Sequence, residues 1–302
     1  MAGLTRKFHD LYGSFFARHT VHFRLQNFVK YVHRKMDRLH IPLFHVDAFT
    51  EQPFRGNPAA VCLLESWLDE DLLRRVATEN NLSATAFVVT TGNSYELRWF
   101  TPLCEIKLCG HPTLAAAHLL LQVRQDQLDS VTFKTRFRGI LTVSKAEDGL
   151  AMDFPAMPST DCKLMPATLA SALGLKSQPA EVLEANDVYV AVLDSPEAVK
   201  DLRPNFAMLQ ELHPFVVAVT ALGGDVDFVS RYFAPSYGFP EDPVTGSAHC
   251  VLTPYWAARL NKTRLHARQL SERGGELWCE LAGDRVLVTG KAVVTMEGVL
   301  TI

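Results

Sequence analysis

Several features that assign proteins to common classes are missing from this chain. Its 302 residues include no apolar run of the roughly 18 residues that a membrane-spanning helix needs. No Gly-x-Gly-x-x-Gly stretch follows a strand-like segment, which argues against a dinucleotide site. The six cysteines are scattered, and the closest pair, Cys104 and Cys109, has no second pair at zinc-binding spacing. We therefore expect no membrane insertion, no metal site, and the reduced cysteines of an intracellular protein.

Acidic residues are scarce in residues 1–40, which hold eight Lys or Arg and only two acids. This segment carries +6, so the rest of the chain carries −9, given the net charge of −3. An acidic body argues against nucleic-acid binding. Phe8, Leu11 and Phe15 fall at helical spacing, as in a mitochondrial presequence, but Ser is rare. We expect a cytoplasmic protein with a basic extension at 1–39, and mitochondrial targeting is the alternative.

After residue 40, the apolar pattern predicts many short strands and few long helices. Strand-like stretches are "IPLFHVDAF", "NPAAVCLL" and residues 84–91, 95–101, 130–136, 139–145, 150–154, 187–193, 214–220 and 226–234. Apolar residues at helical spacing predict helices at 69–79, 112–123, 166–174, 205–212 and 247–260. This pattern favours an α+β fold over a doubly wound parallel sheet.

The second half of the chain repeats a pattern of the first. "RWFTPLCEIKLCGHPTLAAAHLLL" and "SRYFAPSYGFPEDPVTGSAHCVLTPYW" both read Arg, aromatic, Phe, any residue, Pro, a loop, then Gly at a helix start. His111 and Ser247 are equivalent in this repeat. Two similar lobes, 40–155 joined by the last strand and 156–302, would bring these loops together. A chance likeness of two strand–loop–helix units is the alternative.

Both repeated loops end at a helix N-terminus, where unpaired backbone N–H groups and the helix dipole attract anions. Gly110 and Gly246 would let the backbone approach a ligand. Thr245-Gly246-Ser247 has the composition of a carboxylate or phosphate cradle. A plain N-cap is the simpler interpretation of Ser247. Together the two loops predict a site for a small anionic substrate.

His111 and Asp242 are the candidate proton-handling groups beside these glycines. The positive helix end should lower the pKa of His111 and favour neutral imidazole, which suits hydrogen-bond donation or proton relay. Asp242 can accept hydrogen bonds or orient a catalytic group, although an Asp-Pro pair is more often part of a turn. A purely structural role is the alternative for each residue.

Five stretches carry a family resemblance: "DAFTEQPFRGNPAAVCLL", "ENNLSATAF", "LRWFTPLCEIKLCGHPTLAAA", "SRYFAPSYGFPEDPVTGSAH" and "RGGEL". They resemble the phenazine-biosynthesis PhzF-like family, and its animal members most. The resemblance implies a diaminopimelate-epimerase-like fold, with two pseudo-symmetric lobes that each curl a β-sheet around a central helix. It also implies a homodimer without metal or organic cofactor. An alternative name used within the family also implies a WD-repeat partner.

The bacterial prototype of that family isomerises a dihydro-hydroxyanthranilate by moving a proton along an allylic system. The resemblance therefore implies active-site roles for His111, Asp242 and Ser247. The substrate-binding positions that it implies are Gly110, Thr113, Thr245 and Gly246.

One position departs from the family pattern. The proton-carrying glutamate belongs in "NLSE", and this chain has Ala84 in its place. An alanine methyl cannot carry a proton, and losing a general base typically costs on the order of 10²–10⁴ in rate. Three substitutes are conceivable: Glu79, Glu241, or a base–orienter pair of His111 and Asp242. Glu79 matches a separate family position, and the Glu241 side chain should diverge from its neighbour.

Three functions remain open from the sequence. The first is a cofactor-independent isomerase-like protein that acts on a small carboxylate and is impaired at Ala84. The second is a non-catalytic scaffold that binds a ligand or a protein. The third is a two-cysteine epimerase using Cys109 and Cys250, which the repeat does not place equivalently.

Overall fold

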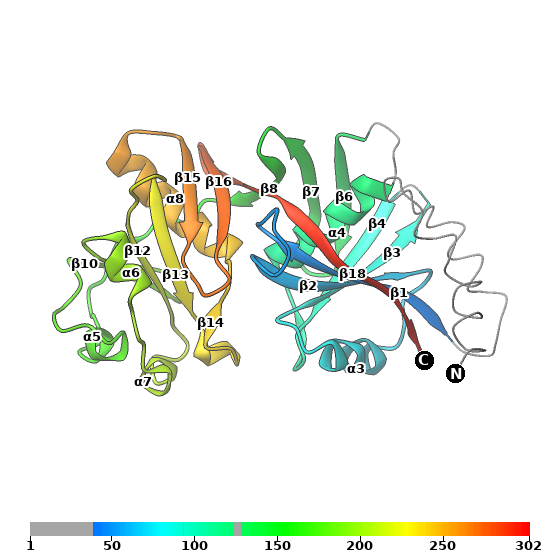
Figure 1. The fold of residues 1–302 in the computed structure, drawn as a ribbon, viewed down its shortest axis with the longest axis horizontal. Helices are drawn as coiled ribbons and strands as arrows, with labels where there is room; N and C mark the ends of the chain where they lie inside the picture. The colour runs from blue at the N-terminus through cyan, green and yellow to red at the C-terminus, as the bar shows by residue number, and fades with distance from the viewer. Residues whose placement is uncertain (1–38, 93, 124–127) are drawn as a thin grey trace, which may run out of the picture. The chain divides into compact units, whose positions relative to one another are not determined.

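The computed structural model describes residues 39–92, 94–123 and 128–302 (Figure 1). The targeting expectation for residues 1–40 lies outside these residues, apart from Leu39 and His40. Within the described ranges, the helices are all too short or too polar to cross a membrane.

The first half of the fold is strand-rich, as predicted. Its elements are β1 (His40–Ala48), β2 (Asn57–Leu64), α3 (Glu70–Asn80), β3 (Thr85–Thr91), β4 (Ser94–Phe100), β5 (Glu105–Ile106), α4 (Gly110–Val123), β6 (Ser130–Thr135), β7 (Gly139–Ala146) and β8 (Gly149–Pro155).

The second half begins with short elements and then repeats the strand–helix order of the first. Its elements are β9 (Thr160–Asp161), α5 (Leu169–Ala172), β10 (Glu181–Ala185), β11 (Val188–Val192), α6 (Pro196–Lys200), α7 (Phe206–Gln210), β12 (Val216–Leu222), β13 (Phe228–Phe233), the 3-10 turn η1 (Pro235–Tyr237), β14 (Glu241–Asp242), α8 (Gly246–Leu260), β15 (Arg264–Gln269), β16 (Gly275–Ala282), β17 (Arg285–Gly290) and β18 (Ala292–Thr301). The predicted helix at 166–174 is only the single turn α5, and its end is set by Gly174, which follows in the left-handed region with φ 74°.

Strand pairing shows the internal repeat directly. In the first half β1–β2 is antiparallel, β2–β3 parallel, β3–β4 antiparallel, β4–β6 parallel, and β6–β7–β8 antiparallel. The second half has the same order of pairings for β10–β11, β11–β12, β12–β13, β13–β15 and β15–β16–β17. A helix, α4 or α8, connects the second parallel pair in each half. The predicted α+β fold of two pseudo-symmetric lobes is confirmed.

The repeat extends to the ion pair beneath each helix-start loop. Arg98 Nε lies 2.7 Å from Glu105 Oε1, and Arg231 Nε lies 2.8 Å from Glu241 Oε1. All four side chains are largely buried. Each pair joins the long strand before the loop to the two-residue strand within it, so both loops are stabilised by an equivalent Arg–Glu ion pair.

The two lobes exchange strands and share one clamp. β18 pairs antiparallel with β1, and β17 pairs antiparallel with β8, so the end of the chain belongs partly to the first lobe. In the "RGGE" turn, Arg273 Nη2 lies 2.7 Å from the buried carboxylate of Asp47. Arg273 Nε and Gly274 also bond the carbonyl and N–H of Gly56, each at 2.8 Å. This clamp holds the loop after β1 against the second lobe.

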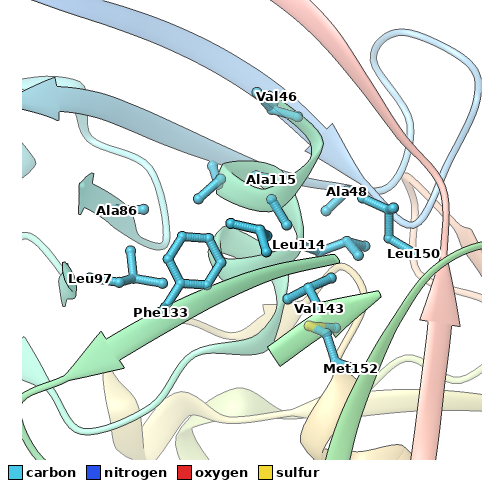
Figure 2. Packing of buried hydrophobic residues seen from close by; sticks show 14 of the residues in the cluster. Val46, Ala48, Ala86, Leu97, Leu114, Ala115, Phe133, Val143, Leu150 and Met152 are labelled. Atoms are coloured by element: carbon cyan, nitrogen blue, oxygen red, sulfur yellow. The ribbon is translucent and has the colours of Figure 1, made fainter. Parts of the chain in front are cut away.

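A hydrophobic core surrounds each central helix. Leu114 and Ala115 of α4 pack against Leu97, Phe133 and Met152 of the surrounding strands (Figure 2). The small side chains of the Ala-rich α4 allow the strands to approach closely.

The α8 core contains a proline with a structural consequence. Pro254 lies inside α8 and has no N–H to offer the carbonyl of Cys250. That carbonyl instead accepts from the Met157 N–H at 2.9 Å. The chain between the lobes is thereby fastened to the middle of α8.

Candidate active site

The segment around Ala84 is positioned by the end of α3. The carboxylate of Asp69 caps this helix, accepting from a first-turn N–H at 2.9 Å, and Asn81 ends it with φ 48°. The chain then turns through Ser83 into β3. Ala84 is fully buried, yet it belongs to none of the four hydrophobic clusters formed by the described residues. A methyl group thus occupies a buried position outside the apolar cores.

His111 lies in the first turn of α4 and is only 6% exposed. Its Nε2 lies 3.2 Å from Ser83 Oγ, and its Nδ1 lies 3.5 Å from Cys109 Sγ. Burial lowers the pKa of His111 to about 3, so the imidazole is neutral at pH 7. Burial also raises the pKa of the Cys109 thiol, which the nearby Asp242 charge raises further, so the thiol stays protonated.

Asp242 lies in β14, where the first half of the repeat has Ile106. Its Oδ2 accepts from Thr245 Oγ1 at 2.5 Å, and its Oδ1 accepts from Asn57 Nδ2 at 2.7 Å. Burial raises the pKa of Asp242 to about 6, although both hydrogen bonds lower it. Most of the carboxylate is therefore ionised at pH 7. The two repeated loops thus differ in charge at this position, although their backbones are equivalent.

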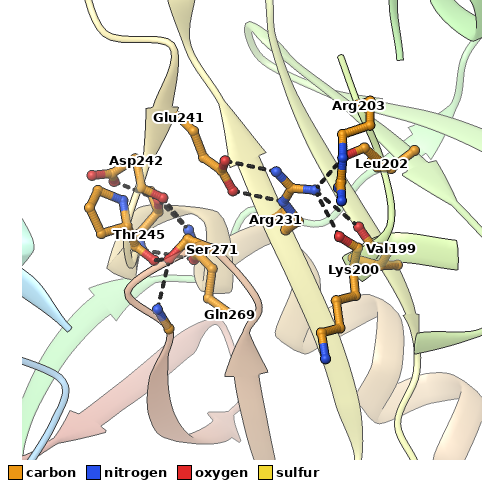
Figure 3. A network of polar contacts seen from close by, with 12 residues as sticks. Val199, Lys200, Leu202, Arg203, Arg231, Glu241, Asp242, Thr245, Gln269 and Ser271 are labelled. Carbon is orange, nitrogen blue, oxygen red and sulfur yellow. Dashed lines mark hydrogen bonds and ion pairs between the residues drawn. The ribbon is translucent and has the colours of Figure 1, made fainter. Parts of the chain in front are cut away.

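Gln269 of β15 fixes the loop that leads into α8 (Figure 3). Its Oε1 accepts from the Thr245 N–H at 2.9 Å, and its Nε2 donates to the Asp242 carbonyl at 2.7 Å. Thr245 is the N-cap residue, and its hydroxyl bonds Asp242 rather than the helix. Ser247 is the second residue of α8 and is exposed. It is therefore not the N-cap residue, and Thr245 occupies that position.

The two glycines of the repeat lie next to each other. A Cβ atom built on Gly110 would lie 4.0 Å from the Cα of Gly246. One built on Gly246 would lie 3.6 Å from the ring of Phe49. The N-termini of α4 and α8 therefore meet at backbone that carries no side chain, as expected for the two repeated loops.

Two residues that the sequence analysis did not single out join these loops. Ser83 Oγ donates to Asn57 Oδ1 at 3.3 Å, and Asn57 Nδ2 donates to Asp242 Oδ1 and to the Val244 carbonyl at 2.7 and 2.8 Å. A chain of hydrogen bonds thus runs from His111 through Ser83 and Asn57 to Asp242. Both residues occur in the stretches that resemble the family, and this resemblance is the sequence feature that could have indicated them as site residues.

The three conceivable substitutes for the missing glutamate are not arranged as the sequence analysis considered. Glu79 is exposed on α3, and Glu241 is paired with Arg231. Among the described residues, His111 and Asp242 share no direct hydrogen bond and are connected only through Ser83 and Asn57.

The cysteines of the epimerase hypothesis occupy unequal positions. Cys109 contacts His111. Cys250 is a buried residue of α8, and its thiol lies 3.7 Å from the Gly246 carbonyl. Burial raises the pKa of Cys250 to about 12. Within the described ranges, no group of three or more His, Cys, Asp and Glu has metal-binding geometry.

Buried neutral histidines predict a loss of stability in acid. The pKa of His111 is lowered to about 3 and that of His249 to about 4, against about 6.5 when unfolded. Their stabilising effect is complete above pH 6.5 and is lost as pH falls, by about 2 kcal/mol each at pH 5. The raised pKa of Asp242 acts in the opposite direction, because its stability contribution is full below about pH 4 and is lost as pH rises through 6.

A single substitution tests this balance. His249→Asn keeps a donor for the Thr245 carbonyl, which His249 Nδ1 contacts at 2.8 Å. We expect it to reduce the loss of unfolding free energy between pH 7 and pH 5 by about 2 kcal/mol, measured by urea unfolding at both values. Equal losses in the variant and the unaltered chain would contradict the prediction.

The fold is of the diaminopimelate-epimerase-like type, which is built from two such lobes. The structure of a hydroxyproline epimerase of Agrobacterium vitis superposes with a TM-score of 0.56 at 11% identity, covering 87% of this chain and 93% of that chain. At that identity the likeness shows the fold alone.

The family is shown by sequence. The family profile described as "Phenazine biosynthesis-like protein" matches residues 46–298, and the chain belongs to this family. A PhzF family protein of Enterococcus faecalis has a TM-score of 0.83 at 43% identity, covering 87% of this chain and all of that chain (100%).

Curated relatives come from bacteria and animals. An uncharacterized isomerase of Pseudomonas aeruginosa is 50% identical over 256 residues, 84% of this chain and 97% of that protein. The phenazine biosynthesis-like domain-containing protein of Homo sapiens is 39% identical over 288 residues, 86% of this chain and 99% of that protein. The resemblance to animal members is confirmed, and the bacterial protein is the more similar of these two.

Proposed function

We propose that this protein is a cofactor-independent isomerase of small carboxylates that acts by proton transfer and is weakened by Ala84. The observation that carries the proposal is the hydrogen-bonded chain from His111 through Ser83 and Asn57 to Asp242, between two repeated helix N-termini. Membership of a family that includes an uncharacterized isomerase supports the reaction class.

The helix starts supply the substrate-binding part of the proposal. The first-turn N–H groups of α8, beside the exposed Ser247, would bind the substrate carboxylate. Gly110 and Gly246 would let the substrate approach the backbone. The hydroxyls of Thr113 and Thr245 already bond the Cys109 carbonyl and Asp242, at 2.6 and 2.5 Å, so we assign these two residues to positioning.

Asp242 is the group best suited to take a proton from carbon. Its pKa of about 6 lies near neutral pH, where a general base combines ionisation with useful basicity. The same proton, returned to the other end of an allylic system, completes an isomerisation without a redox partner. The neutral imidazole of His111 would serve as a proton relay, because its unprotonated ring nitrogen can accept a proton.

The test is deuterium uptake from heavy water into a dihydro-hydroxyanthranilate. We expect slow uptake with the unaltered chain, and loss of at least about 100-fold with Asp242→Asn, which keeps the shape but removes the base. Uptake that Asp242→Asn leaves unchanged would show that Asp242 is not the base.

A non-catalytic binding protein is the second candidate, and the buried methyl group of Ala84 favours it. In that case calorimetry would detect binding of the same carboxylate while the unaltered chain gave no deuterium uptake above buffer. The homodimer and the WD-repeat partner implied by the resemblance stay predictions.

A further inference from the structure

The orientation of the Asn57 side-chain amide is fixed by its neighbours. Asn57 is completely buried, and its Nδ2 lies 2.7 Å from Asp242 Oδ1 and 2.8 Å from the Val244 carbonyl oxygen. A backbone carbonyl can only accept, whatever the protonation of Asp242, so the amide nitrogen must face these two atoms. The amide oxygen then faces Ser83 Oγ, 3.3 Å away, and must accept from that hydroxyl.

The direction of donation continues from Ser83 to His111. A serine hydroxyl has one proton, and here it is donated to Asn57. The Ser83 oxygen must then accept from His111 Nε2 at 3.2 Å. The remaining ring nitrogen, Nδ1, is bare and can accept from the Cys109 thiol at 3.5 Å. The reverse arrangement would leave the buried oxygen of Asn57 without a donor.

We propose that Asn57 and Ser83 are positioning residues through which the second lobe fixes the tautomer of His111 in the first. Both atoms that orient Asn57 belong to the loop before α8, whereas His111 begins α4. The proton of the neutral imidazole is held on Nε2, and Nδ1 is the basic nitrogen. Any proton that His111 takes up therefore arrives at Nδ1, beside Cys109. A catalytic role for this proton rests on the proposed function.

The test is nitrogen NMR of the full chain labelled with ¹⁵N-histidine, at pH 7 and without substrate. Two-bond couplings between ring protons and nitrogens distinguish the protonated nitrogen from the bare one. His111 of the unaltered chain should carry its proton on Nε2. Asn57→Leu removes the acceptor of Ser83, whose hydroxyl then donates to Nε2 and moves the ring proton to Nδ1.

Ser83→Ala provides a second variant, because it removes only one oxygen. A proton on Nε2 then has no acceptor, whereas one on Nδ1 can still contact Cys109 Sγ, so the tautomer ratio should shift toward Nδ1 by at least tenfold. Thr85→Val is the matched control: it removes a nearby hydroxyl whose partner is Asn80, at 3.2 Å, and should leave the ratio unchanged.

Two results overturn the proposal. One is a proton on Nδ1 in the unaltered chain, and the other is a ratio that Ser83→Ala does not change. Because these spectra need no substrate, they test the tautomer of His111 independently of the deuterium-uptake test of the proposed function.

Discussion

Ala84→Glu is expected to raise deuterium uptake into a dihydro-hydroxyanthranilate by on the order of 10²–10⁴ over the unaltered chain. Position 84 is fully buried and outside the hydrophobic clusters, so a carboxylate there would lose hydration. Desolvation raises the pKa of a carboxyl group toward neutrality, where it can both take and return a proton at pH 7. Position 84 directly follows Ser83, the partner of His111, so the new carboxyl group is introduced in the segment that holds the existing hydrogen-bonded chain.

Ala84→Gln is the matched control for this experiment. It has the size and shape of Glu but no ionisable proton, so any gain due to packing or substrate contact would appear in both variants. Uptake is measured in heavy water from the rate of mass increase, with substrate present at equal occupancy. Equal uptake by Glu and Gln variants would remove the missing base as the explanation for weak chemistry.

The duplicated scaffold could be predicted from the sequence because its signals are local. The Arg, aromatic, Phe and Pro pattern lies within one strand and loop, and Gly at each helix start follows a few residues later. The structure places the predicted Gly110 and Gly246 side by side and puts His111 and Asp242 at their two loops. Local spacing reports strand and helix ends well, because turns and caps depend on neighbouring residues.

The connection between the loops could not be predicted in the same way. Asn57 bonds Asp242 across 185 positions in the sequence, and no periodicity relates two such residues. Their contact depends on the fastening of the lobes by Arg273 and Asp47 and by the strand exchange of β17 and β18. The sequence also gives no signal that Thr245 bonds Asp242 rather than capping α8, because a threonine hydroxyl suits either partner.

Gly56→Ala is expected to lower the free energy of unfolding by at least about 4 kcal/mol, which is exceptional for a single methyl group. Gly56 has φ 64°, and a Cβ there would lie 2.1 Å from the Ala48 carbonyl oxygen and 2.8 Å from Thr50 Cγ2. The backbone cannot shift easily, because its N–H and carbonyl both bond the turn that contains Arg273, each at 2.8 Å. Asn57 follows directly, so any shift would also disturb the link to Asp242.

Gly283→Ala separates steric overlap from backbone conformation. Gly283 has nearly the same φ, 66°, but a Cβ there would meet nothing within 4 Å. Both variants carry the roughly 1–2 kcal/mol cost of a left-handed alanine, and only Gly56→Ala adds the overlap with Ala48. Urea unfolding at pH 7 gives both free energies, with unchanged slopes showing that the two-state comparison holds. If Gly56→Ala costs no more than Gly283→Ala, the loop after β1 moves freely and does not hold Asn57 against the second lobe.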